Sequence, residues 1–137
     1  MTLVDASVAF KWLIPEPGTT EAERFLTENA ELVAPELILA EVGNALWKAQ
    51  RRGAQPAQDF GVAIRDLQSS FTQLFRLEPL VQRASELARE LDHPIYDCFY
   101  LACAETIGEP LVTADLRLLP VQTKRAALLM YRLTFHQ

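Results

Sequence analysis

The stretch Thr2-Leu3-Val4-Asp5 is a short apolar run that ends on a carboxylate, and we expect it to form a buried first strand. The stretch Leu111-Val112-Thr113-Ala114-Asp115 has the same form much later in the chain. Helical patterns and other short apolar runs alternate between the two. In a chain of 137 residues, this alternation predicts an α/β fold, with a parallel sheet of four or five strands covered by helices on both faces.

The remaining elements follow from hydrophobic periodicity and from the residues that start and stop helices. We expect Ser7 to cap a short helix that ends before Pro15. Further helices are expected over residues 20–29, 36–52, 56–70, 79–91 and 96–107, with partial helix over 116–129 and strands over 32–34, 73–77 and 131–135. Gly53 is expected just past the end of its helix. No repeat or linker interrupts residues 1–137, which we interpret as a single domain.

Composition is that of an ordinary globular protein, with half of the residues hydrophobic and 23 % charged. No apolar run is long enough for a membrane-spanning helix. The first residues have no basic start and carry an early acid, Asp5, so no signal peptide is expected and the protein is predicted to be cytoplasmic. Cys98 and Cys103 lie five apart in an apolar helical segment, so we expect two small buried side chains rather than a disulfide or a zinc pair.

The net charge of −5 disfavours a nucleic-acid partner, because such proteins usually carry a basic surface. This objection weakens if several acids surround one divalent cation, since the cation reverses the local field. Charge alone therefore leaves nucleic acid open.

Two carboxylates follow predicted strands directly. Asp5 and Asp115 stand at the carboxyl ends of their strands, and in open parallel sheets binding sites form just outside those ends, at the switch point. The alternative is that each acid only caps the helix after it.

Two further acids lie in apolar helices. Glu41 shares a narrow polar stripe with Asn44 and Lys48, which is either a solvent-facing stripe or part of a site. Asp97 has no polar face around it, and burying an unpaired carboxylate is costly, so it needs a cation or several donors. An acid in a first helical turn is also favoured by the helix dipole.

Together the four acids predict a magnesium site, because magnesium prefers hard oxygen ligands from one or two carboxylates, with water and substrate phosphate. No histidine cluster competes: His93 precedes Pro94 at a break, His136 lies next to the last residue, and both are expected to be structural or exposed. Ser7 has no histidine base beside it, so we interpret it first as a cap and second as a hydroxyl lining the acids. Thr113 has the same ambiguity, with strand packing as its structural alternative.

Four stretches resemble the PIN domain, and more narrowly the VapC toxins of bacterial and archaeal toxin–antitoxin pairs, in order and with the family's spacing. They are Val4-Asp5-Ala6-Ser7-Val8-Ala9, Ala34-Pro35-Glu36-Leu37 through Glu41-Val42-Gly43-Asn44-Ala45-Leu46, Tyr96-Asp97 with its apolar helix, and Leu111-Val112-Thr113-Ala114-Asp115.

The resemblance implies a three-layer α/β/α fold and an endoribonuclease that depends on magnesium or manganese. It also implies an RNA substrate, a homodimer and inhibition by a cognate antitoxin. By matching positions, it implies metal ligation by Asp5 and Asp97, with Glu41 and Asp115 completing a catalytic quartet. Ser7, Asn44 and Thr113 would support it.

Some members of the family carry another acid shortly after the fourth one, where this sequence has Arg117. The resemblance therefore does not imply a second metal ion. Basic residues near the acids are candidates for RNA backbone contacts: Lys11, Lys48, Arg51, Arg52 and Arg117. For Arg51 and Arg52 a helix C-terminus explains the charge equally well. Trp12 and Trp47 are expected to pack in the core, and the alternative for both is an exposed apolar surface that serves a dimer or an antitoxin.

Two other functions fit parts of the pattern. A non-catalytic PIN-like module would bind RNA or protein without cutting, although an intact acidic quartet disfavours it. A phosphatase or receiver-like protein would use Asp5 as a nucleophile, but the phosphatase chemistry requires a second acid at position 7, which is Ser7.

Overall fold

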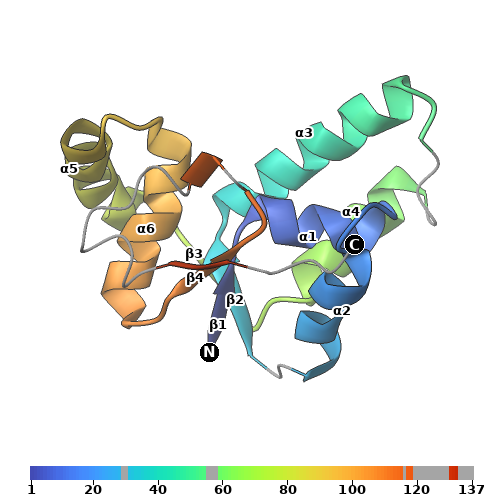
Figure 1. The fold of residues 1–137 in the computed structure, drawn as a ribbon, viewed down its shortest axis with the longest axis horizontal. Helices are drawn as coiled ribbons and strands as arrows, with labels where there is room; N and C mark the ends of the chain where they lie inside the picture. Colours follow the sequence, from blue (N-terminus) through green and yellow to red (C-terminus); the bar gives the residue numbers. More distant parts are fainter. Residues whose placement is uncertain (29–30, 55–58, 116, 119–129, 133–137) are drawn as a thin grey trace.

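A parallel sheet forms the middle layer of the molecule (Figure 1). The computed structural model describes residues 1–28, 31–54, 59–115, 117–118 and 130–132. Five strands pair in this part of the chain, in the order β3-β2-β1-β4-β5. They are β1 (Thr2–Val4), β2 (Leu32–Pro35), β3 (Gln73–Phe75), β4 (Leu111–Thr113) and β5 (Met130–Arg132). Every pairing is parallel, as the sequence predicts.

Helices cover both faces of the sheet. The helices are α1 (Ala6–Leu13), α2 (Thr19–Glu28), α3 (Leu37–Arg51), α4 (Phe60–Ser69), α5 (Val81–Leu91) and α6 (Ile95–Ile107), with a 3₁₀ turn at Glu78–Leu80. Figure 1 shows α5 and α6 on one side of the sheet and α1 to α4 on the other. The predicted three-layer α/β/α arrangement is confirmed. None of the described helices is both long enough and apolar enough to span a membrane.

The sheet order makes β1 the central strand and places a switch point beside it. The chain runs outward from β1 to β2 and β3, and then returns to β4 on the other side of β1. Leu3 pairs with Leu111 and Val4 with Val112. Asp5 therefore leaves the sheet directly beside Thr113, and its backbone N–H donates to the Val112 carbonyl at 3.2 Å.

The core explains the composition of α6. Every residue from Cys98 to Ala104 is buried in this helix, which packs against α5 and reaches β2 and β4. Cys98 and Cys103 are free and buried, as predicted. Burial raises the pKa of the two thiols to about 11 and about 12, so both are inert. Arg83 fixes α5 to α6 from outside, with two hydrogen bonds to Glu105 of 2.7 and 3.0 Å.

Besides shifts of one residue at ends of α2, α3 and α6, helix boundaries differ from the prediction at three places. The cap of α1 is Asp5, not Ser7, because the Asp5 carboxylate accepts from two backbone N–H groups of the first turn. The predicted helix over 79–91 begins as the 3₁₀ turn at Glu78–Leu80. The fourth helix begins at Phe60 with Asp59 as its cap, and its predicted start at Pro56 lies outside the described residues.

Two expectations for the later chain are tested only in part. The last strand is β5 at Met130–Arg132, one residue earlier than predicted, and positions 133–135 lie outside the described residues. Most of the predicted partial helix over 116–129 also lies outside them. The ends of α3 and α6 agree with the prediction: Gly53 and Gly108 follow them with φ of 87° and 68°, a region that glycine enters without strain.

The prediction that both tryptophans pack in the core is wrong for Trp47. Its side chain is 49 % exposed on α3, with the Arg51 guanidinium 5.0 Å from the ring centroid. Trp12 is half-buried against Phe71 and donates from its indole N–H to the Ala22 carbonyl at 2.7 Å.

Candidate active site

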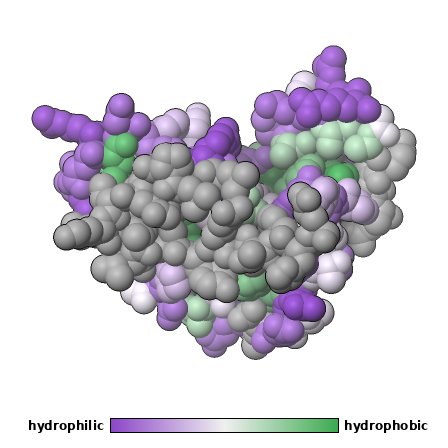
Figure 2. All heavy atoms as spheres, viewed as in Figure 1, coloured by the Kyte–Doolittle hydropathy of each residue, from purple (hydrophilic) through white to green (hydrophobic). Residues whose placement is uncertain are grey.

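A pocket of about 730 Å³ opens at the carboxyl edge of β1 and β4. Its walls come from α1, from one face of α3, from the start of α6 and from the segment after β4. On the face of the molecule seen in Figure 2, a notch rimmed by hydrophilic side chains separates the α5–α6 side from the arm formed by α3. The four predicted acids all line this pocket, as do Ser7 and Asn44. Thr113 is buried behind Asp5.

Asp5 is the most buried of the acids, with only 5 % of its surface exposed. Its Oδ1 atom accepts from the Ser7 backbone N–H (3.1 Å), the Val8 N–H (3.3 Å) and the Ser7 hydroxyl (2.5 Å). Its Oδ2 atom accepts from the Thr113 hydroxyl at 2.5 Å. Burial raises the pKa of Asp5 to about 6, even though these hydrogen bonds lower it.

Two hydroxyls tie the ends of β1 and β4 around Asp5. The Ser7 hydroxyl accepts from the Ala114 backbone N–H at 2.9 Å, and the Thr113 hydroxyl accepts from the Asp115 N–H at 3.0 Å. The second interpretation of Ser7, a hydroxyl lining the acids, therefore describes its place in the structure. Each hydroxyl both donates to Asp5 and accepts from a backbone N–H, so the carboxylate has little rotational freedom.

Glu41 reaches the pocket from α3 and is half-buried. The Tyr100 hydroxyl of α6 donates to its Oε1 atom at 2.6 Å. Burial raises the pKa of Glu41, the Tyr100 hydrogen bond lowers it, and the charge of Asp97 raises it further. Tyr100 itself is almost fully buried, with 1 % of its surface exposed. This pair joins the two helices that face each other across the pocket.

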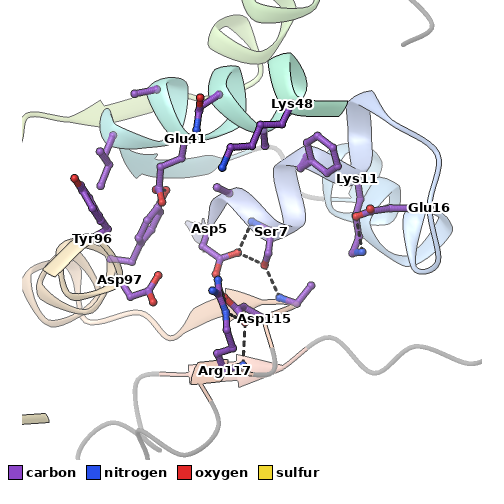
Figure 3. A pocket seen from close by; sticks show the side chains of 18 residues that line it. Asp5, Ser7, Lys11, Glu16, Glu41, Lys48, Tyr96, Asp97, Asp115 and Arg117 are labelled. Atoms are coloured by element: carbon purple, nitrogen blue, oxygen red, sulfur yellow. Dashed lines mark hydrogen bonds and ion pairs between the residues drawn. The ribbon is translucent and has the colours of Figure 1, made fainter. Parts of the chain in front are cut away.

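Asp97 lies in the first turn of α6 and points toward Asp5 and Glu41 (Figure 3). Its Oδ2 atom lies 2.6 Å from Nε2 of His93, four residues earlier. The residues flanking Pro94 bring the imidazole of His93 back onto Asp97, a contact that the sequence does not predict. The negative charge of Asp97 contributes to the raised pKa of both Asp5 and Glu41, so the three carboxylates share one electrostatic environment.

Asp115 differs from the other three acids because its carboxylate forms an ion pair with the Arg117 guanidinium. The Arg117 guanidinium donates to it from Nη2 at 2.7 Å and from Nε at 3.0 Å, and the Arg117 backbone N–H adds a third contact at 2.9 Å. The Arg117 hydrogen bonds hold the pKa of Asp115 below its usual value. The arginine side chain is 84 % exposed, so solvent screens this pair.

Residues 2–123 match the family model of the PIN domain. The chain belongs to the PIN-domain family. This PIN domain is 33 % identical to Ribonuclease VapC3 of Pyrobaculum aerophilum, over 85 % of this chain and 90 % of the relative. It is 32 % identical to Exonuclease VapC9 of the same organism, over 90 % of this chain and 86 % of the relative. Ribonuclease VapC12 of Mycobacterium tuberculosis is also 32 % identical, over 86 % of this chain and 89 % of the relative.

A solved structure has a similar fold. The crystal structure of PAE2754 from Pyrobaculum aerophilum superposes with a TM-score of 0.66 at 28 % identity, covering 89 % of this chain and 79 % of that one. The narrower resemblance to VapC proteins is confirmed by the relatives above.

The donor set of this PIN domain fits a hard divalent cation. The ligating atoms available are carboxylate oxygens from four separate elements. Within the described residues, no three histidine, cysteine or acidic side chains already stand close enough together to enclose an ion. Burial raises the pKa of two of these carboxylates, Asp5 and Glu41, and the charge of Asp97 raises both further. Carboxylate oxygens are the ligands that a hard ion such as magnesium prefers, one or two of them together with water.

Sequence reasoning missed Tyr100 and His93 as members of the PIN-domain site. Tyr100 is 59 residues from Glu41 and sits in an apolar helix where a tyrosine is an ordinary core residue. His93 carried a usable signal, since it precedes Asp97 by four residues, the spacing of neighbours on a helix. Asn44 is exposed and lines the pocket one turn after Glu41 on α3.

Proposed function

We propose that this chain is a divalent-metal-dependent endoribonuclease, the toxin of a type II toxin–antitoxin pair. The observation that carries the proposal is the convergence of Asp5, Glu41, Asp97 and Asp115 on one pocket at the switch point of the sheet. The relatives named as ribonucleases support the choice of RNA. An acidic pocket binds a polyanion only with the help of a cation, which accounts for a net charge of −5 in a ribonuclease.

Asp5 and Asp97 would hold the ion, Mg²⁺ or Mn²⁺. When bound, the ion supplies positive charge to a phosphate oxygen and makes a nearby water more acidic. Ser7 and Thr113 fix the Asp5 carboxylate, and His93 fixes that of Asp97, so both ligands are oriented before the ion arrives.

Glu41 is the acid best suited to accept the proton of the attacking water. Its raised pKa makes it a stronger base than an ordinary glutamate, whereas Arg117 holds the pKa of Asp115 down and occupies both its oxygens. The water oxygen forms the new bond to phosphorus, the bond from phosphorus to the leaving ribose oxygen breaks, and that oxygen takes up a proton. Asp115 then acts with Arg117 as a positioning pair at the rim of the pocket.

The proposal extends to the assembly and the place of action. On the likeness to VapC proteins, we propose a homodimer that acts in the cytoplasm and is inhibited by a cognate antitoxin, with residues 1–137 as a single catalytic domain. Light scattering on the purified protein measures the first of these. Co-expression of the neighbouring gene product tests the antitoxin, because it should relieve growth arrest. No relief would favour a housekeeping nuclease.

The deciding experiment compares wild type with Asp5→Asn on linear and circular single-stranded RNA, with Mg²⁺, Mn²⁺ or EDTA. Asp66→Asn is the matched control, because this acid is exposed on α4, away from the pocket. We expect metal-dependent cutting by wild type and control, and none by Asp5→Asn. Circular RNA tests the internal cut, since one relative is named an exonuclease. Binding without cutting, unchanged by the substitution, would identify a non-catalytic RNA-binding module instead.

A further inference from the structure

Two exposed side chains of the pocket have no part in the acidic site. Tyr96 lies at the start of α6 and is 61 % exposed, and Lys48 lies on the pocket face of α3. Neither side chain makes a hydrogen bond or an ion pair within the described part of the chain. Tyr100, one turn further along α6, shows the contrast: it is buried, and its hydroxyl is bonded to Glu41.

Lys48 differs from the other basic side chains that line the pocket. Lys11 is held by Glu16 at 2.7 Å and by the Pro17 carbonyl at 2.9 Å, and Arg117 is held by Asp115. Figure 3 shows the Lys48 side chain reaching from α3 toward the space above Asp5, with its ammonium group in the pocket. It follows Glu41 by seven residues, or about 10 Å along the helix. An ammonium group at that distance suits a phosphate beside the one at the acids.

Tyr96 presents an aromatic ring on the opposite wall. Tyr96 directly precedes Asp97 and lines the same pocket, so a molecule bound at the acids lies close to the ring. Leu37 and Ala40, at the start of α3, add apolar surface to the same pocket. An exposed ring stabilises the fold little, whereas a nucleic-acid base offers a flat apolar face of matching size. Only an unpaired base has that face free, because in a duplex it is covered by its neighbours.

We propose that Tyr96 stacks on the base next to the cleaved phosphate and that Lys48 binds a neighbouring phosphate, so that these two residues position the RNA strand between α3 and α6. The inference rests on the proposed ribonuclease function and adds to it two residues that position the substrate. Charge complementarity supports RNA as the ligand. The metal ion held by the acids would face one phosphate, and the Lys48 ammonium group would face the next.

The first test measures the affinity for a labelled single-stranded RNA in the Glu41→Gln background with Mg²⁺, which removes the proposed base, leaves both proposed metal ligands and keeps the RNA intact. Tyr96→Leu is expected to weaken binding about five- to 150-fold, the range found for loss of one stacked base. Tyr96→Phe and Tyr96→Trp keep a ring and are expected to bind within about twofold of the parent, an estimate that treats stacking as the main contribution. Trp47→Leu is the matched control, an exposed aromatic side chain outside the pocket lining.

The second test separates a phosphate contact from general attraction. Lys48→Gln is expected to reduce the slope of log affinity against log salt concentration by about 0.7, the value for one phosphate contact on a single strand. Arg89→Gln changes the net charge equally, but on the exposed surface of α5, and is expected to leave the slope unchanged. Annealing a complementary strand is expected to abolish the difference between Tyr96→Leu and Tyr96→Phe.

Kinetics in the wild-type background separate the two proposals. If the protein cuts RNA, Tyr96→Leu should raise KM with little change in kcat. A protein that cuts RNA while both variants keep wild-type affinity, salt slope and KM would overturn this inference and leave the ribonuclease standing. If the protein cuts no RNA with any of the metals, the proposed ribonuclease function itself is refuted. Unchanged RNA binding with weakened capture of a partner polypeptide would make these walls a protein-docking surface and overturn the inference.

Discussion

Replacing Asp5 with asparagine exchanges a buried carboxylate for a neutral group of nearly the same shape. The remaining oxygen of the amide can still accept from Ser7 and Val8, and its NH₂ group faces the Thr113 hydroxyl, which can accept as well as donate. The substitution therefore removes the charge and keeps most of the hydrogen bonds. We expect the variant to lose activity and gain stability in the absence of divalent metal.

The magnitude follows from the pKa of Asp5. Burial raises it from 3.8 to about 6, so ionising this carboxyl in the folded protein costs about 3 kcal/mol more than in the unfolded chain at neutral pH. The pKa of Asp5 is higher in the folded protein than in the unfolded chain. The neutral carboxyl therefore contributes its full share to the free energy of unfolding below pH 3.8, and this contribution is lost as the pH rises through about 6. The amide never ionises and avoids the loss. Allowing for one poorer hydrogen bond, we expect a gain of roughly 1 to 3 kcal/mol above pH 7.

The assay is urea unfolding in EDTA at pH values from 4 to 8, for wild type, Asp5→Asn and the surface control Asp66→Asn. The difference in the free energy of unfolding between wild type and Asp5→Asn should grow between pH 4 and 6 and then stay constant. Added Mg²⁺ should stabilise wild type and narrow the difference, since the ion compensates the buried charge. A difference that is independent of pH, or a variant less stable than wild type at pH 8, would refute the reasoning about desolvation.

Three further predictions concern the groups around the acids and the core beneath them. Tyr100→Phe removes the hydrogen bond that lowers the pKa of Glu41, so the acidic limb of the pH–rate profile should move to higher pH; an unmoved limb would exclude Glu41 as the base. His93→Ala frees the Asp97 carboxylate and should weaken Mn²⁺ binding, followed by calorimetry, about 10- to 100-fold with little change in melting temperature; equal loss of both would indicate a structural role. Leu111→Ala truncates a fully buried side chain of β4 and should cost about 2 to 5 kcal/mol in urea unfolding; a loss below 1 kcal/mol would mean that the site tolerates the cavity.

The framework of the site is predictable because it depends on short-range patterns. An apolar run that ends on a carboxylate, seen at Asp5 and again at Asp115, is enough to place both acids at one edge of a parallel sheet. The apolar surroundings of Asp97 indicated a need for a partner. The metal and catalytic roles of these acids remain predictions until they are measured.

The partners of the acids depend on tertiary packing, and the sequence does not specify them. The bond from Tyr100 to Glu41 exists only because α6 crosses close to α3, and nothing in either helix alone indicates it. Pro94 suggests a simple break, which hides the return of His93 onto Asp97. Trp47 is predicted to pack in the core, but it lies near the C-terminal end of α3, where its side chain is exposed.

The hydroxyl bridge between β1 and β4 has a consequence for the order of events during synthesis. Thr113 donates to a carboxylate made 108 residues earlier, so Asp5 emerges from the ribosome long before its pocket can form. At about 5 to 20 residues per second, that interval lasts roughly 5 to 20 s. During it, the central strand has β2 beside it but β4 is still unmade. A growing chain therefore carries no assembled acid pocket next to the RNA of its own ribosome, and the nuclease centre is completed only when β4 and Asp115 have been added.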